Sequence, residues 1–149
     1  MQTDLEADRL AGKIRTAGLK VTAQRLAVLR ALENTPHSSA DRVLGVVREE
    51  LPAISAQAVY GILSAFTDAG VARRIEPAGS PALYESRVGD NHHHLVCISC
   101  GTIRDVDCVI GQAPCLAPSD DSGFTVIAAE VTFSGVCSSC RQQAEYSAR

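Results

Sequence analysis

The sequence predicts an α+β protein in two parts, a helical N-terminal part followed by a smaller β-rich part. Three observations predict this division. Apolar residues recur at helical spacing as far as Gly70, and short strand-like runs begin directly after it. Both Cys-x2-Cys pairs of the chain lie in the second part. The 149 residues, 46% of them hydrophobic, are enough for two small domains that share an interface.

The charges are unevenly distributed along the chain. Up to Tyr84 there are 10 basic and 9 acidic residues, whereas from Glu85 onward there are 4 basic and 8 acidic residues. This asymmetry agrees with two parts of different function. Aromatic residues make up only 4% of the chain and tryptophan is absent, which argues against a protein that stacks single-stranded bases on aromatic platforms.

No targeting or membrane segment is expected. The first 15 residues alternate charged and apolar side chains, and no stretch approaches the about 18 consecutive apolar residues of a membrane span. We therefore expect a cytoplasmic protein with no membrane partner. In a reducing compartment, six cysteines favour metal binding or redox sensing over a disulfide framework.

Boundary signals divide the N-terminal part into four helices. Thr22 and Ser38 are expected N-caps, and Ser38 with Asp41 three residues on resembles a capping box. Gly18, Pro36 and Pro52 mark where the first three helices end. The fourth helix, residues 55–69, begins at the N-cap Ser55 and ends before Gly70. Its apolar residues have the spacing of one buried stripe: Val59, Ile62, Leu63 and Phe66.

Two strand-like runs, residues 71–75 and 82–85, follow the fourth helix and are separated by a loop rich in proline and glycine. Helices followed by a hairpin are the order of a winged helix-turn-helix, in which residues 55–69 form the recognition helix. Tyr60 on its polar face is suited to a thymine methyl, a base edge or a phosphate. The candidate DNA-contacting residues are Arg25, Ser55, Gln57, Tyr60 and Arg73, with Ser64 and Arg74 beside them. The alternative is a generic helical subdomain with solvated charges and a half-buried tyrosine.

The second part begins after a linker, residues 86–91. Residues 93–97 and 103–106 are expected strands on either side of a Cys-x2-Cys-Gly turn, and residues 125–133 form a longer β-rich stretch. Residues 107–123 are loop-like and carry two further thiols.

The strongest chemical signal is a pair of Cys-x2-Cys motifs separated by 36 residues. Each pair is expected in a tight turn, and four thiolates at tetrahedral positions are what a closed structural zinc site requires. In so small a domain the zinc would contribute directly to folding. The expected ligands are Cys97, Cys100, Cys137 and Cys140. The alternative is free or redox-paired thiols.

Three consecutive histidines precede the first motif. His92 and His94 project from the same face of a strand, and His93 points the other way. Two imidazoles on one face suit a divalent transition metal, and nearby carboxylates favour iron or manganese. The candidate carboxylates are Glu85, Asp90, Asp105 and Asp107. By itself His37, the remaining histidine, is expected to be a capping or surface residue.

The sequence resembles the repressors of the ferric uptake regulator family over nearly its whole length. The resemblance is carried by residues 19–25, 37–40, 55–60, 84–85, 92–101 and 137–140. It implies a homodimer with an N-terminal winged helix that binds double-stranded operator DNA and a C-terminal α/β dimerisation domain. Residues 84–94 look most like the actinobacterial branch that represses catalase or catalase-peroxidase genes. The corresponding division is residues 1–85 for DNA binding, 86–91 for a hinge and 92–149 for dimerisation and metal binding.

The resemblance also implies a regulatory iron or manganese site with ligands from both domains and the hinge. The implied ligands are His37, Glu85, His92, His94 and Asp105. A metal bridging two domains favours one interdomain angle, and in a dimer that angle sets the spacing of two recognition helices. His37 is therefore expected to be a ligand once the resemblance is taken into account.

Asp105 stands where iron sensors of this family usually carry glutamate, and in this respect the sequence resembles the peroxide sensors. In those proteins ferrous iron reacts with peroxide and a ligand histidine is oxidised, which by analogy is His37 or His92. Glu85 departs from the aspartate common in peroxide sensors of other bacteria. One alternative is an iron-uptake repressor without peroxide chemistry. Another is a thiol switch formed by Cys108 and Cys115, which by a simpler interpretation are small apolar residues.

Two other classes of protein are also compatible with parts of the sequence. A hydrolytic metalloenzyme is disfavoured because no His-Glu-x2-His motif is present. A zinc-ribbon interaction module without DNA binding would use the cysteines alone. We expect a regulator rather than an enzyme, with peroxide as its only small-molecule signal.

Overall fold

The computed structural model describes residues 2–90, 92–107, 120, 122–125 and 131–148. The chain divides into two compact units, Met1–Gly89 and Asp90–Arg149. Within the described residues, none of the helices combines the length and apolar character needed to cross a membrane.

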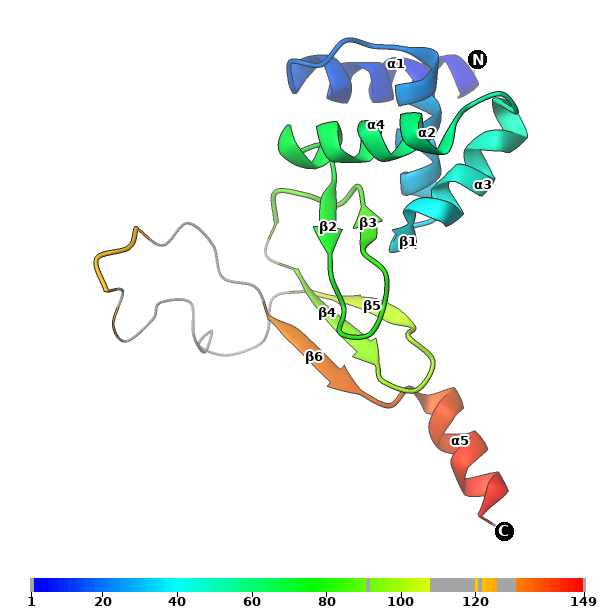
Figure 1. Ribbon diagram of the computed structural model, residues 1–149, viewed down its shortest axis with the longest axis vertical. Helices are drawn as coiled ribbons and strands as arrows, with labels where there is room; N and C mark the ends of the chain where they lie inside the picture. The colour runs from blue at the N-terminus through cyan, green and yellow to red at the C-terminus, as the bar shows by residue number, and fades with distance from the viewer. Residues whose placement is uncertain (1, 91, 108–119, 121, 126–130, 149) are drawn as a thin grey trace. The chain divides into compact units, whose positions relative to one another are not determined.

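The N-terminal unit consists of helices and a small sheet (Figure 1). The helices are α1 (Gln2–Thr16), α2 (Ala23–Asn34), α3 (Ala40–Glu50) and α4 (Ala56–Asp68). The strands are β1 (Ser38–Ser39), β2 (Arg73–Ile75) and β3 (Leu83–Glu85), in the order β1-β3-β2 with antiparallel pairing. This is the predicted winged helix-turn-helix, with β2 and β3 as the wing.

The core of this unit is an apolar cluster to which all four helices contribute. The predicted stripe of α4 is buried, with Val59, Leu63 and Phe66 fully inaccessible to solvent. Phe66 also fixes the chain after the helix, because its carbonyl accepts from the N–H groups of Val71 and Ala72 at 2.8 and 3.1 Å. The wing strand therefore begins at Arg73, two residues later than expected.

Two of the three predicted N-caps are confirmed, and one is wrong by a single residue. The hydroxyls of Thr22 and Ser55 accept from the N–H groups three residues on, at 3.2 and 3.0 Å. The cap of α3 is Ser39 rather than Ser38. Ser38 lies in β1, opposite Tyr84 of β3, and its hydroxyl donates to the Thr35 carbonyl at 2.6 Å.

The C-terminal unit is built on the central strand β4 (His93–Cys97). The strand β5 (Ile103–Val106) pairs with it antiparallel on one side, and β6 (Thr132–Gly135) pairs with it parallel on the other. The helix α5 (Ser138–Ser147) follows β6. The first two strands match their predicted bounds. The strand β6 overlaps the expected stretch 125–133 only at residues 132 and 133 and continues to Gly135, and residues 126–130 of that stretch lie outside the described residues.

Candidate metal centres

The first cysteine pair lies where β4 ends. Cys97 is the last residue of the strand and is 5% exposed. The chain then turns back, and the Gly101 N–H donates to the Cys97 carbonyl at 2.9 Å. Gly101 has a φ of 75°, a left-handed conformation that glycine adopts without strain. The sequence Cys-x2-Cys-Gly therefore forms the predicted turn.

The second pair does not lie in a tight turn, as the sequence suggested, but at the start of a helix. Cys137 is the N-cap of α5, and Cys140 lies in the first turn of that helix. Parallel pairing of β6 with β4, including an Ile98 N–H to Gly135 carbonyl bond of 2.9 Å, brings this helix end to the first pair. The Cys137 N–H donates to the Cys97 sulfur at 3.3 Å.

The four sulfurs form a cluster of the size that zinc requires. All four Sγ atoms lie within 4.8 Å of one another, and those of Cys100 and Cys137 are 3.8 Å apart. Zinc–sulfur bonds of about 2.3 Å in a tetrahedron place neighbouring sulfurs about 3.8 Å apart. The donor set and its dimensions therefore fit a structural zinc ion.

The thiols of this cluster have divergent proton affinities. N–H groups, foremost that of Cys137, lower the pKa of Cys97 to about 6 because they stabilise its thiolate. A hydrogen bond from the Thr102 hydroxyl, 3.1 Å away, lowers the pKa of Cys100. Conversely, the neighbouring sulfurs, Cys137 first and Cys100 second, raise the pKa of Cys140 to about 12. At neutral pH Cys97 is therefore largely a thiolate that can bind a cation, whereas Cys140 must lose its proton before it can do so.

A second group of donors occurs in the N-terminal unit. His37 directly precedes β1, and the pairing of β1 with β3 places it beside Glu85 at the end of β3. The two side chains lie with His37 Nε2 at 3.0 Å from Glu85 Oε2. Glu85 is fully buried, and His37 has a φ of 57°, which is uncommon for a residue other than glycine. Strained backbone conformations of this kind cluster at active sites, ligand-binding sites and switch regions.

A third group occupies one face of β4 and β5. His94 lies opposite Asp105 in the register, with Nε2 at 3.4 Å from Asp105 Oδ1. His92 Nε2 is 3.9 Å from the same oxygen, and the two imidazole rings meet edge to face at 4.9 Å. His93 turns the other way and meets the ring of Phe133, as the strand alternation predicts.

Asp90 lies behind this group. Its Oδ1 is 2.5 Å from His92 Nδ1, which leaves Nε2 of the same ring on the side of Asp105. A carboxylate in this position fixes the tautomer and orientation of a ligand histidine. Sequence reasoning took Asp90 only as a possible ligand, and it missed Thr102 altogether. Their positions in the sequence could have indicated both residues, because Asp90 lies two residues before His92 and Thr102 two residues after Cys100.

The predicted DNA-contacting residues lie on several elements of the N-terminal unit. Ser55, Gln57 and Tyr60 are exposed on α4, although the Ser55 hydroxyl also caps the helix. Arg25 donates to the Lys20 carbonyl at 2.7 Å and so orders the chain before α2. Arg73 begins the wing strand β2. Cys108 and Cys115 lie outside the described residues.

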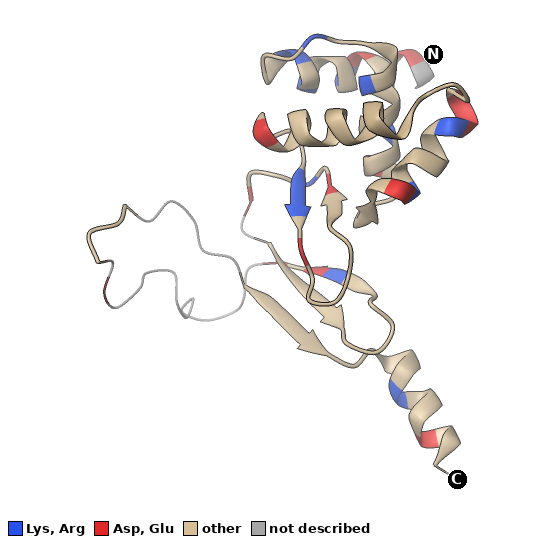
Figure 2. Ribbon diagram, viewed as in Figure 1, with Lys and Arg blue, Asp and Glu red and all other residues tan. Residues whose placement is uncertain are grey.

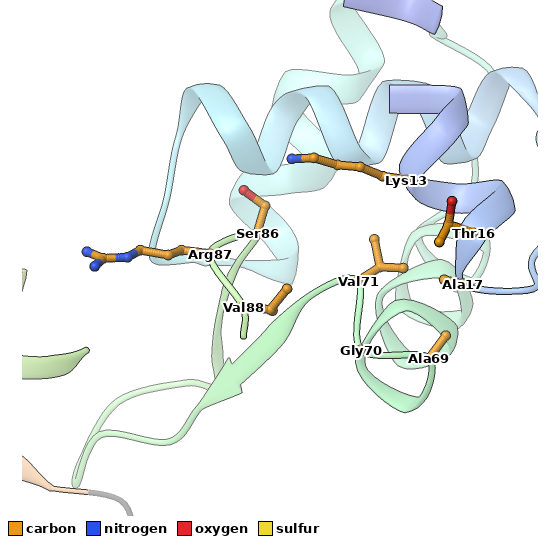
Figure 3. Close-up of a pocket in the computed structure, with 9 residues that line it drawn as sticks. All are labelled: Lys13, Thr16, Ala17, Ala69, Gly70, Val71, Ser86, Arg87 and Val88. Carbon is orange, nitrogen blue, oxygen red and sulfur yellow. The ribbon is translucent and has the colours of Figure 1, made fainter. Parts of the chain in front are cut away.

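A hollow of about 700 Å³ in the N-terminal unit is formed by the ends of α1 and α4 and the segment after β3 (Figure 3). Among the described residues its lining includes Lys13, Ser86 and Arg87, but no histidine, cysteine or carboxylate. The described part of the hollow therefore offers no ligand set for a metal ion.

A family model described as "Ferric uptake regulator family" matches residues 16–134. The chain belongs to the ferric uptake regulator family. It is 55% identical over 130 residues to the "Transcriptional regulator FurA" of Mycobacterium tuberculosis, covering 87% of this chain and 88% of that protein. Among solved structures, the Vibrio cholerae ferric uptake regulator superposes with a TM-score of 0.64 at 26% identity, covering 85% of this chain and 98% of the other.

The Campylobacter jejuni peroxide stress regulator has 31% identity and a TM-score of 0.53, over 56% of this chain and 62% of its own. Membership of the family makes the chain a metal-responsive transcriptional regulator, and the family consists of regulators rather than enzymes.

We predict that zinc binding to the metal-free protein becomes tighter as the pH rises through neutrality, because Cys140 must lose a proton while Cys97, with its pKa of about 6, is already ionised. Competition with a chromogenic chelator at several pH values measures this dependence. At neutral pH fewer than four protons should leave per zinc ion, because Cys97 is already largely ionised. Cys137→Ser should lose the site, and Ser139→Ala in the same helical turn should keep it. Zinc affinity that does not change with pH, or zinc retained by Cys137→Ser, would contradict the assignment.

Proposed function

We propose that this chain is a homodimeric, metal-dependent repressor that binds double-stranded operator DNA, responds to peroxide and controls catalase-type defence genes. The observation that carries the proposal is the division of the donors into three sets with two kinds of chemistry. One is an all-thiolate cluster, and the other two are a His–carboxylate pair and a His–His–carboxylate group. Such a regulator acts on DNA, so we propose that it works in the cytoplasm.

The thiolate set is proposed to hold a structural zinc ion. Cys97 terminates β4, while Cys137 and Cys140 begin α5, so a zinc ion would connect two chain segments that are distant in sequence. In a unit of this size a bound zinc ion contributes directly to the free energy of folding. This ion is expected to stay bound in every regulatory state.

The other two sets are proposed to share one regulatory ion, iron or manganese. His37 and Glu85 offer two donors, and His92, His94 and Asp105 offer three. Neither set by itself fills the coordination of such an ion, whereas five nitrogen and oxygen donors suit it. Residues 86–91 are proposed as a hinge between residues 1–85 and 92–149. An ion that binds both donor sets would favour one arrangement of these two domains and would shift the population of molecules toward that arrangement.

DNA recognition is assigned to α4 and its surroundings. The helix carries no lysine or arginine (Figure 2), so its polar residues are available to read bases but supply no charge toward phosphates. The flanking cations Arg25, in the first turn of α2, and Arg73 and Arg74, in the wing, are proposed to supply that charge. A dimer would present two such helices to two half-sites.

Peroxide sensing is the finer part of the proposal. It is supported by Asp105, which is an aspartate as in the peroxide sensors that the sequence resembles, and by the relation to the Campylobacter jejuni peroxide stress regulator. Ferrous iron held by these residues would activate the O–O bond of peroxide. One oxygen atom would be added to the imidazole of His37 or His92, which supplies the two electrons, and the other would leave as water. The alternatives are an iron-uptake repressor without peroxide chemistry and a thiol switch at Cys108 and Cys115.

We predict that operator binding requires the regulatory ion and that in Glu85→Gln the ion no longer strengthens operator binding as it does in wild type. Manganese should tighten binding of the zinc-loaded wild type to its operator by about 5- to 150-fold, which corresponds to about 1–3 kcal/mol of coupling. The variant should lose most of this gain, because a neutral amide is a weaker ligand than a carboxylate. Fluorescence anisotropy with labelled duplex measures the affinity. Glu49→Gln, an exposed change in α3, is the matched control and should respond like wild type.

We predict that a low peroxide dose releases DNA from the iron form and leaves the manganese form bound. Mass spectrometry of the same samples should find one added oxygen on the peptide containing His37 or His92. Release accompanied instead by loss of two hydrogens between Cys108 and Cys115 would favour the thiol switch. Release by chelation alone, with no response to peroxide, would leave a repressor that responds to metal only.

A further inference from the structure

Tyr60 and Asp41 form a polar pair on the surface of the N-terminal unit. Tyr60 lies on α4 and is 49% exposed, and Asp41 lies in the first turn of α3. The Tyr60 hydroxyl is 3.0 Å from Asp41 Oδ1. The pair therefore holds the exposed ring of the proposed recognition helix against the N-terminal end of the neighbouring helix.

The direction of this hydrogen bond follows from the chemistry of the two groups. A carboxylate accepts hydrogen bonds and donates none, so Tyr60 is the donor. The hydrogen bond to Asp41, together with its charge, raises the pKa of Tyr60, so the phenol keeps its proton. A phenol has a single proton, and here that proton is used within the protein. The oxygen then offers only its lone pairs to a ligand.

We infer that Tyr60, positioned by Asp41, acts on duplex DNA as a hydrogen-bond acceptor and reads an exocyclic amino group in the major groove, N6 of adenine or N4 of cytosine. This inference rests on the proposed DNA-binding function of α4. The alternatives for the hydroxyl are phosphate oxygens, guanine O6 and thymine O4, all of which only accept hydrogen bonds. Such a partner would meet the lone pairs of Tyr60, and a phosphate would also meet the negative charge of Asp41.

The test uses the full-length protein loaded with zinc and manganese. Wild type first selects duplexes from a randomised library. In the selected duplex each adenine is then replaced in turn by purine, and each cytosine by 2-pyrimidinone, which lack the amino group. At one position wild type should lose about two- to tenfold in affinity, the range expected for one neutral hydrogen bond. Tyr60→Phe lacks the hydroxyl and should not lose this affinity at that position. Any effect of the analogue on base pairing is common to both proteins, so the difference between wild type and Tyr60→Phe measures the hydrogen bond alone.

Asp41→Ala frees the hydroxyl proton, and its selected sequences should shift at that position toward bases that present guanine O6 or thymine O4. Asp68→Ala, which removes an acidic residue at the other end of α4, is the charge-matched control and should keep the wild-type preference. If Asp41→Ala fails to fold, the comparison of wild type with Tyr60→Phe decides by itself.

Three results would overturn the inference. The first is equal sensitivity of wild type and Tyr60→Phe to removal of the amino groups. The second is an unchanged base preference in Asp41→Ala. The third is a loss of affinity in Tyr60→Phe that is the same for all DNA sequences, as expected for a phosphate contact. If wild type selects no duplex at all, the proposed function fails along with the inference. If wild type selects duplexes but its affinity does not respond to removal of any amino group, the inference is wrong and the proposed function stands.

Discussion

The register of β4 is the constraint on which the chemistry of the C-terminal unit depends. One end of this five-residue strand carries His94, and the other ends at Cys97. Pairing with β5 sets His94 opposite Asp105, and pairing with β6 delivers the second cysteine pair. A slip of one residue would turn every side chain of the strand to the opposite face. A zinc ion at the cysteine end would hold the register that the histidine end requires.

In the N-terminal unit a still shorter strand pairing brings two functional side chains together. The strand β1 has only two residues, and its pairing with β3 brings His37 to Glu85. His37 has a left-handed backbone, which costs about 1–3 kcal/mol and persists only where the surroundings enforce it. The buried carboxylate and its imidazole neighbour therefore form a site whose geometry depends on a short, weakly determined strand. A ligand that uses both groups would stabilise that geometry.

The parts of this protein that local signals determine could be predicted from the sequence. The stripe and cap of α4 follow from helical spacing and Ser55, and the cysteine cluster follows from two short motifs. The parts that depend on distant segments could not. Pairing with β3 draws Ser38 into a strand and shifts the cap to Ser39, and the second cysteine pair begins a helix instead of a turn. The Asp41 bond to Tyr60 likewise joins two helices, and no spacing rule relates them.

The central claim is that one regulatory ion and operator DNA favour the same arrangement of the chain. Thermodynamic linkage then requires a reciprocal effect: operator DNA must tighten manganese binding by the same factor by which manganese tightens operator binding. We would titrate manganese into the zinc-loaded dimer with and without operator duplex, and follow the ion by its electron paramagnetic resonance. We expect the two factors to be equal, and Glu85→Gln should lose most of both. Manganese affinity that is unchanged by saturating operator DNA would contradict it.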